Sequence, residues 1–357
     1  MNIFSRLLSQ DLPRSRILAI LLLAILIGLV ITPFAFPGAK TLNVAAKILV
    51  FIVLVASYDL LIGYTGIVSF AHTMFFGIGA YGIAIASNKW GASWSSLAIG
   101  AALAVVISLL LSLLIGLLSL RVRAIFYAMI TLAIASAFLT LASQLSDFTG
   151  GEDGITFKLP ELLAPSSQFF NAPVLGITID GKILTYYLVL VAALLLFLVM
   201  LRIVNSPFGR VLQAIRENDF RAEAIGYKTV IYRTLSNVLA SGFATLAGCL
   251  LAIWLRYNGP DTSLSFEIML DVLLIVVIGG MGTLYGAVIG SVLFLLAQSY
   301  LQDLMKVASE ATQSVPMLAA LLSPDRWLLW LGILFVLSVY YFPSGVVGKL
   351  RSASTRS

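Results

Sequence analysis

Residues 183–204 read ILTYYLVLVAALLLFLVMLRIV, and Arg202 is the one charged residue among them. About 20 helical residues cross the hydrocarbon core of a membrane, so a stretch of this length is typical of a transmembrane helix. It is apolar on every side, whereas the strands of a membrane barrel alternate apolar and polar residues. The stretch therefore indicates a helical membrane protein.

The rest of the chain repeats this pattern. Of the 357 residues, 60% are hydrophobic and 11% are charged, and the mean hydropathy is +1.04. Soluble domains carry about 25% charged residues, so a water-soluble class is excluded. We predict an all-α polytopic membrane protein in which residues 1–357 form a single transmembrane domain. The ten predicted spans cover about residues 17–36, 44–63, 66–87, 95–120, 124–145, 183–204, 236–256, 266–280, 284–302 and 326–347.

The distribution of charge predicts the orientation. If the N-terminus is cytoplasmic, the inner segments hold 14 of the 22 Lys and Arg residues and a net charge of +10, while the outer loops hold a net charge of −2. Basic residues concentrate in cytoplasmic loops, so both termini and residues 205–235 are expected inside, and residues 146–182 outside. The overall charge of +6 then reflects topology, and no nucleic-acid partner is expected.

Patterns of catalytic residues do not occur in the sequence. It holds one cysteine, Cys249, and one histidine, His72, with no metal-ligand spacing and no phosphate-binding loop. We therefore expect a chain that is not an enzyme and that holds no cofactor or metal of its own. If transport is driven by a nucleotide, another subunit must hydrolyse it.

The inner segment 205–226 predicts a short amphipathic helix that starts at Ser206 and Pro207 and ends at Gly226. Its apolar residues fall at positions i, i+3, i+4 and i+7. Glu217 and Arg221 are spaced for an ion pair, and a break near Asn218 is compatible with the pattern. Two interpretations stay open, a helix on the membrane surface and a helix that docks on a soluble partner. The apolar stripe consists of Phe208, Val211, Leu212 and Ile215.

Two glycine-rich membrane segments each carry an acid. Residues 59–82 and 271–290 share the pattern Ile-Gly-x-x-Gly at a shift of 216 residues, which suggests an internal repeat with both copies at an inner turn. A charged residue at mid-membrane costs about 3 kcal/mol on insertion scales, so these acids are candidates for a transport path or for helix packing. The candidate residues are Asp59, Gly63, Gly66, Ser69, His72, Asp271, Gly279, Gly280 and Gly282.

Four motifs together look like the M-type permeases of branched-chain amino acid ABC transporters. They are GYTGIVSFAHTMFFGIGAY (63–81), FTGGEDGI (148–155), SPFGRVLQAIRENDFRAEAIGY (206–227) and VIGGMGTLYGAVIG (277–290). The resemblance implies a type II ABC importer permease fold, in which residues 206–226 match the loop that couples the permease to its ATPases. The implied coupling residues are Phe208, Gly209, Arg210, Ala214, Arg216, Glu217, Asp219, Glu223 and Gly226.

The same resemblance implies partners. These are a homologous H-type permease, two cytoplasmic ABC ATPases that bind ATP and Mg²⁺, a periplasmic binding protein, and the lipid of a bacterial inner membrane. Related permeases carry urea, short amides or other amino acids, and nothing in the sequence separates these substrates from leucine, isoleucine and valine. A self-sufficient secondary transporter is the alternative from another class, with Asp59 and Asp271 as its candidate ion ligands.

Overall fold

The computed structural model describes residues 15–119, 124–167, 180–311, 321–342 and 344–354. The N-terminal segment, residues 168–179 of the predicted outer loop and residues 312–320 lie outside this range. The long helices are α2 (Arg16–Ala35), α3 (Ala39–Thr65), α4 (His72–Trp90), α5 (Trp94–Ser119), α6 (Ala124–Gln144), α8 (Gly181–Val204), α11 (Thr229–Leu255), α13 (Phe266–Gly279), α14 (Leu284–Ala311) and α16 (Trp327–Tyr341).

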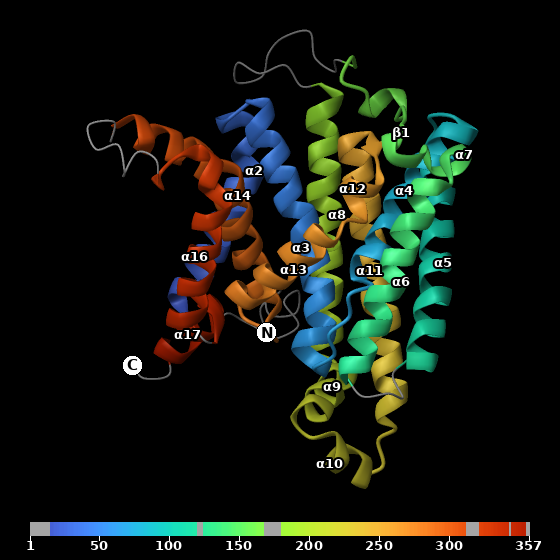
Figure 1. The fold of residues 1–357 in the computed structure, drawn as a ribbon, viewed down its shortest axis with the longest axis vertical. Helices are drawn as coiled ribbons and strands as arrows, with labels where there is room; N and C mark the ends of the chain where they lie inside the picture. Colours follow the sequence, from blue (N-terminus) through green and yellow to red (C-terminus); the bar gives the residue numbers. More distant parts are fainter. Residues whose placement is uncertain (1–14, 120–123, 168–179, 312–320, 343, 355–357) are drawn as a thin grey trace, which may run out of the picture.

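The shorter elements lie mainly at the two ends of this helical bundle (Figure 1). The short α-helices are α7 (Ser146–Thr149), α9 (Pro207–Glu217), α10 (Asp219–Ala224), α12 (Pro260–Ser263) and α17 (Gly345–Ser354). The 3₁₀ turns are η1 (Gly151–Asp153), η2 (Glu161–Leu163) and η3 (Pro324–Arg326), and the strands are β1 (Ile155–Thr156) and β2 (Tyr257–Asn258). We call the end that holds β1 and β2 the sheet end, and the end that holds α9 and α10 the loop end.

The predicted fold class is confirmed. Among the described residues, nine helical stretches are long and apolar enough to cross a membrane. They overlap nine of the ten predicted spans, and the tenth overlaps the 19-residue helix α4. Every predicted span therefore falls on a helix.

In the two glycine-rich segments, the span predicted at 66–87 starts too early, whereas the short span predicted at 266–280 agrees with helix α13. The helix expected from residue 66 begins at His72, because Gly66 takes a left-handed conformation with φ +72° and ends α3. Helix α13 has 14 residues, which gives a length of about 21 Å against about 30 Å of hydrocarbon. Both glycine-rich segments are thus interrupted helices, and the connections between the pieces mix buried residues such as Ser69 and Gly280 with exposed ones such as Gly66 and Met281.

Burial separates an inner set of helices from an outer set. In the most apolar window of α3, 89% of the residues are buried, whereas the figure is 17% in both α2 and α6. The outer helices expose large apolar side chains such as Leu110, Ile125 and Met129. Such faces are stable in contact with lipid and would associate in water.

Small residues set the central crossing of α4 with α11. A Cβ added to Gly79 would lie 1.9 Å from the carbonyl oxygen of Thr245, and one added to Gly248 would lie 1.8 Å from that of Phe76. The two backbones therefore touch, as small residues in membrane helices allow. This contact packs α4 closely against α11 at the centre of the bundle.

At the sheet end, the chain after α6 is tied to the chain after α11. Strand β1 pairs antiparallel with β2, with Ile155 opposite Asn258. Helix α11 stops at Arg256, which has a φ of 57°, and the guanidinium of Arg256 donates a hydrogen bond of 3.2 Å to the carbonyl of Leu163. This cap and the loop α9–α10 lie at opposite ends of the bundle (Figure 1).

Candidate functional site

The loop end carries two short helices with the predicted caps. The hydroxyl of Ser206 accepts a hydrogen bond of 3.4 Å from the backbone N–H of Gly209 at the start of α9. The side chain of Asn218 accepts one of 2.9 Å from the N–H of Arg221 and starts α10. Gly226 follows with φ +97° and ends the unit. The predicted start, break and end of this helical segment are confirmed.

The apolar stripe of α9 packs against the chain itself. Leu212 and Ile215 are each 1% exposed, and the ring of Phe208 stacks on that of Tyr232 in α11 with centroids 5.9 Å apart. The stripe therefore lies neither on a membrane surface nor open to a partner. It holds α9 against the bundle, with Phe208 on α11.

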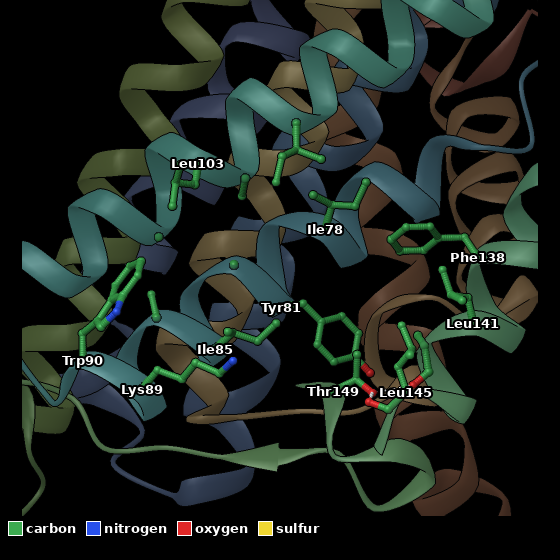
Figure 2. A pocket seen from close by; sticks show the side chains of 16 residues that line it. Ile78, Tyr81, Ile85, Lys89, Trp90, Leu103, Phe138, Leu141, Leu145 and Thr149 are labelled. Atoms are coloured by element: carbon green, nitrogen blue, oxygen red, sulfur yellow. Dashed lines mark hydrogen bonds between the residues drawn. The ribbon is translucent and has the colours of Figure 1, made fainter. Parts of the chain in front are cut away.

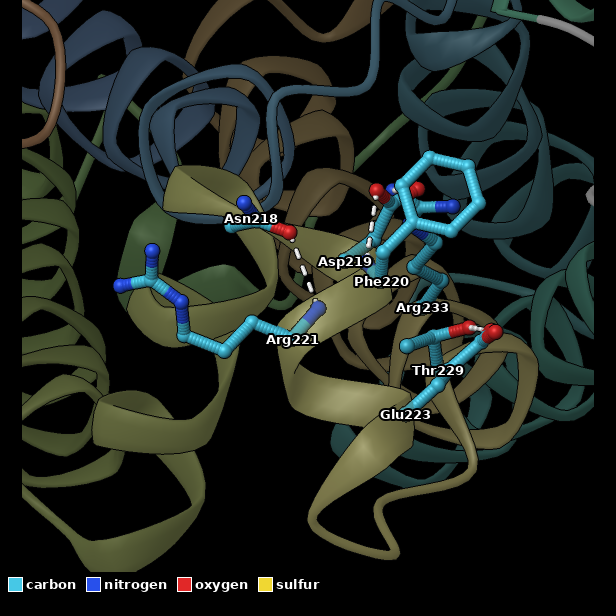
Figure 3. A network of polar contacts seen from close by, with 7 residues as sticks. All are labelled: Asn218, Asp219, Phe220, Arg221, Glu223, Thr229 and Arg233. Carbon is cyan, nitrogen blue, oxygen red and sulfur yellow. Dashed lines mark hydrogen bonds and ion pairs between the residues drawn. The ribbon is translucent and has the colours of Figure 1, made fainter.

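Two acids fasten α10 to the first turns of α11 (Figure 3). Asp219 forms an ion pair of 3.3 Å with Arg233, and the hydroxyl of Thr229 donates a hydrogen bond of 2.5 Å to Glu223. The predicted pair of Glu217 with Arg221 is absent from the ion pairs of the described residues. That prediction is wrong because α9 ends at Glu217, so the two residues do not share one helix.

The surface that the loop leaves free is different from the predicted stripe. Phe220 is 82% exposed and Ile225 is 68% exposed, while Ala214, Glu217 and Arg210 are also exposed. Phe220 and Ile225 are thus large apolar side chains that the folded loop leaves uncovered. Sequence reasoning missed Phe220, although a phenylalanine away from the apolar stripe of its helix was a usable signal.

Arg216 joins this loop to the glycine-rich segments. Its guanidinium donates a hydrogen bond to the carbonyl of Gly63 near the end of α3. A Cβ on Gly66 would lie 3.5 Å from the Arg216 side chain, and one on Gly282 would lie 2.8 Å from its Nη1. Because glycines occupy these positions, the Arg216 side chain has the space it needs to reach α3. We call Asp59, Gly63, Arg216 and Gly282 the Arg216 junction.

The second half of this junction is a bond between the two glycine-rich segments. The carboxylate of Asp59, which is 2% exposed, accepts a hydrogen bond of 2.8 Å from the backbone N–H of Gly282. A Cβ on Gly63 would lie 2.5 Å from that same nitrogen. The two copies of the Ile-Gly-x-x-Gly pattern thus meet in space, with Arg216 of α9 beside them.

The other glycines of the second copy close its turn. Gly280 ends α13 with φ +115°, and a Cβ on Gly279 would lie 2.0 Å from the carbonyl oxygen of Gly286 in α14. These two residues shape the turn between α13 and α14. They do not contact the Arg216 junction by a bond that the structure records.

His72 and Ser69 lie apart from the junction. His72 is 1% exposed, and its Nε2 lies 2.9 Å from the hydroxyl of Ser57. Its ring is 5.1 Å from that of Tyr58. This histidine is a hydrogen-bonded interior residue, the interpretation favoured by the sequence for a lone histidine. Ser69 is buried in the connection before α4, whereas His72 is the first residue of α4.

Asp271 belongs to a separate polar cluster. Its carboxylate accepts a hydrogen bond of 3.2 Å from the amide of Gln298 in α14, whose oxygen accepts one of 3.3 Å from the ammonium of Lys47 in α3. The charge count assigned Lys47 to the outer loops. The structure corrects this, because Lys47 lies inside α3. A lysine within a predicted apolar span was the signal that would have found it.

A pocket of about 300 Å³ lies between α4, α5 and α6 (Figure 2). Lys89 and Trp90 stand at one end, and the walls are apolar side chains such as Ile78, Leu103 and Phe138. None of the predicted site residues lines it. A polar solute would lose its hydration there with little replacement, so the pocket does not suit the transport path. Among the described residues, no group of three His, Cys, Asp or Glu could hold a metal ion.

The comparison with known proteins identifies the family of the chain. A family model described as branched-chain amino acid transport system, permease component, matches residues 40–339. The chain belongs to this family. It is a multi-pass membrane permease component of ABC transporters, a class that works with ATPase subunits and a binding protein. The resemblance of the four motifs is thereby confirmed.

Relatives extend the similarity over most of the chain. It is 25% identical over 344 residues to the high-affinity branched-chain amino acid transport system permease protein LivM of Escherichia coli, which covers 92% of this chain and 75% of the relative. The LivM protein of Salmonella typhimurium gives the same identity and coverage. A probable LivM protein of Methanocaldococcus jannaschii is 26% identical over 231 residues, 64% of this chain and 61% of the relative. No solved structure matches the chain.

Proposed function

We propose that this permease component imports leucine, isoleucine and valine across a bacterial inner membrane. It does so by alternating access, and separate ATPases, which hold the ATP and Mg²⁺, drive the cycle. The chain itself performs no catalysis. The substrate class is supported by the printed descriptions of its family and relatives.

The Arg216 junction is the observation that carries this proposal. Helix α9 belongs to the loop that resembles the ATPase-coupling loop, and Arg216 extends from it to the carbonyl of Gly63. Asp59 then connects α3 to the turn between α13 and α14 through the N–H of Gly282. A displacement of the loop by an ATPase is thus transmitted to the ends of three membrane helices.

The partners follow from the exposed surfaces. Phe220 and Ile225 are the apolar contacts that we assign to an ATPase, with Ala214 allowing close approach and Glu217 and Arg210 on the polar rim. The largely exposed outer helices α6 and α16 leave room for a homologous H-type permease as well as for lipid. The cap formed by β1 and β2 at the sheet end faces the binding protein, with both termini in the cytoplasm.

Uptake by the reconstituted transporter tests this proposal. Vesicles that contain this chain, its H-type partner and the ATPases are loaded with ATP and supplied with the binding protein. Radiolabelled leucine, isoleucine, valine, other zwitterionic amino acids and urea are compared. We expect ATP-dependent uptake of the three branched-chain amino acids. Uptake of urea alone would contradict the substrate, and uptake that continues without ATP would contradict the ATP-driven class.

A further inference from the structure

Three polar side chains from three different helices form a chain of hydrogen bonds inside the bundle. Lys47 of α3 donates to the amide oxygen of Gln298 in α14 at 3.3 Å. The amide nitrogen of Gln298 donates to Asp271 of α13 at 3.2 Å. A full positive and a full negative charge are therefore held on either side of one neutral amide group.

The three residues of this cluster lie inside predicted spans, Lys47 in 44–63, Asp271 in 266–280 and Gln298 in 284–302. Lys47 follows the first residue of α3, Ala39, by eight positions, a distance of about 12 Å along the helix. Asp271 follows the first residue of α13, Phe266, by five positions, or about 8 Å. Each charge costs about 3 kcal/mol to place at mid-membrane on insertion scales, and such residues mark substrate pathways.

The cluster is also open, in contrast to the acid of the Arg216 junction. Lys47, Asp271 and Gln298 are all half-buried, whereas Asp59 is almost completely enclosed. Nearer the sheet end, the same helices α3 and α14 carry an exposed ion pair between Lys40 and Asp303. One exposed ion pair thus lies on the same two helices between the cluster and the sheet end.

The bonding pattern of the Gln298 amide identifies a ligand class. The amide presents an acceptor to the ammonium of Lys47 and donors to the carboxylate of Asp271. A free amino acid carries an α-carboxylate and an α-ammonium group. These groups satisfy the same two partners through charge-assisted hydrogen bonds, which are about twice as strong as those of a neutral amide. A zwitterion can therefore take the place of the amide, whereas urea carries no charge to match either side.

We propose that Lys47 and Asp271 form a low-affinity site for the zwitterionic backbone of an amino acid on its way through the permease. Lys47 binds the carboxylate, Asp271 binds the ammonium, and Gln298 holds the two charged groups together while the site is empty. This inference rests on the proposed import of amino acids. It assigns the recognition of the backbone to this chain, at a step after release from the binding protein.

The test measures leucine uptake and ATP hydrolysis in the same vesicles and compares their ratio. Lys47→Met and Asp271→Asn should each lower the leucine taken up per ATP hydrolysed by about tenfold or more, because one charge of the zwitterion then lacks its partner. Lys47→Arg should keep the ratio within about twofold. Lys306→Met serves as the matched control, since it removes a lysine of α14 that does not belong to the cluster. An unchanged ratio in both neutralised variants overturns the proposal and leaves a structural role, which would lower uptake and hydrolysis together.

A second measurement uses the unaltered transporter and does not depend on the folding of variants. Its thermal unfolding is followed without ATP or binding protein, in the presence of tens of millimolar ligand. Leucine should raise the unfolding temperature by mass action, while 4-methylpentanoate, which lacks the ammonium, and 3-methylbutylamine, which lacks the carboxylate, should not. Equal shifts with all three compounds, or none with leucine, overturn the zwitterion site.

The two proposals fail in different ways. Wild-type uptake of leucine with unchanged ratios in the variants removes the zwitterion site and leaves the proposed function intact. Wild-type uptake of another zwitterionic amino acid removes the branched-chain assignment, and the same variants are then tested with that amino acid. Wild-type uptake of urea alone overturns both.

Discussion

The carboxylate of Asp59 accepts a hydrogen bond of 2.8 Å from the backbone N–H of Gly282, although the two residues are 223 positions apart in the chain. Gly282 is the last glycine of the second copy of the Ile-Gly-x-x-Gly pattern, and Asp59 lies three residues before the first copy. The bond gives a buried acid a structural partner at the point where Arg216 of α9 reaches the bundle. It supports the packing interpretation of Asp59 more than a role as an ion ligand.

Two replacements of Asp59 should show whether its stabilising role depends on the hydrogen-bond acceptor or on the negative charge. In Asp59→Ala the N–H of Gly282 remains buried without an acceptor, which costs about 1–3 kcal/mol. Asp59→Asn keeps a carbonyl oxygen and should cost less. We expect thermal unfolding in detergent to rank wild type above Asp59→Asn, and Asp59→Asn above Asp59→Ala. Equal unfolding temperatures for wild type and Asp59→Ala would show that this bond does not stabilise the fold.

Gly63 should tolerate no side chain. A Cβ there would lie 2.0 Å from Oδ1 of Asp59 and 2.5 Å from the nitrogen of Gly282, so Gly63→Ala should open the junction at a cost of about 1–3 kcal/mol and lower uptake. Gly28→Ala in α2 is the control, since a Cβ there meets nothing within 4 Å. Both are measured by uptake and unfolding temperature. A Gly63→Ala protein with the properties of Gly28→Ala would contradict the close contact.

Replacements of the two phenylalanines of the loop should affect different properties, ATPase binding for Phe220 and permease stability for Phe208. Phe220→Ser removes an exposed apolar contact, so the ATPases should dissociate more readily, by about 2 kcal/mol or more for an interface anchor, while the permease keeps its stability. Phe208→Ser breaks the stacking on Tyr232 and should lower the unfolding temperature of the permease itself. Co-purification of the ATPases and thermal unfolding measure the two effects. Normal ATPase binding by Phe220→Ser would remove Phe220 from the interface.

The orientation can be measured by labelling cysteines in intact cells. Native Cys249 is buried, so it should react little. Ser166→Cys and Gln213→Cys place thiols at exposed positions at the sheet end and the loop end. A membrane-impermeant maleimide should label Ser166→Cys in intact cells and Gln213→Cys only after lysis. The reverse pattern would show that the predicted orientation is inverted.

The periodic parts of this fold could be predicted from the sequence. Each predicted span falls on a helix, because a run of apolar residues in lipid must pair its backbone groups within the run. The loop helices were predicted with their break at Asn218, because local caps depend on neighbouring residues alone. The start of α4 was predicted six residues early, because the left-handed turn at Gly66 is compatible with a glycine and is not dictated by it.

The contacts between distant segments could not be predicted. Nothing near Arg216 in the sequence indicates that it bonds to Gly63, and nothing near Asp59 indicates Gly282. The stripe that contains Phe208 has the same spacing whether it meets lipid, a partner or its own bundle. Lys47 was counted with the outer loops because a charge count treats each lysine as solvent-exposed, while its partner Gln298 lies on a helix far along the chain.

The pairing of β1 with β2 imposes an order on the synthesis of this protein. Residues 155–156 leave the ribosome before α8, α9, α10 and α11, yet their strand partner at 257–258 follows all four. The cap at the sheet end therefore stays unfinished until α11 and the residues that follow it have been made. A nascent chain that stalls before residue 257 will leave β1 without its partner and the segment after α6 open to proteases.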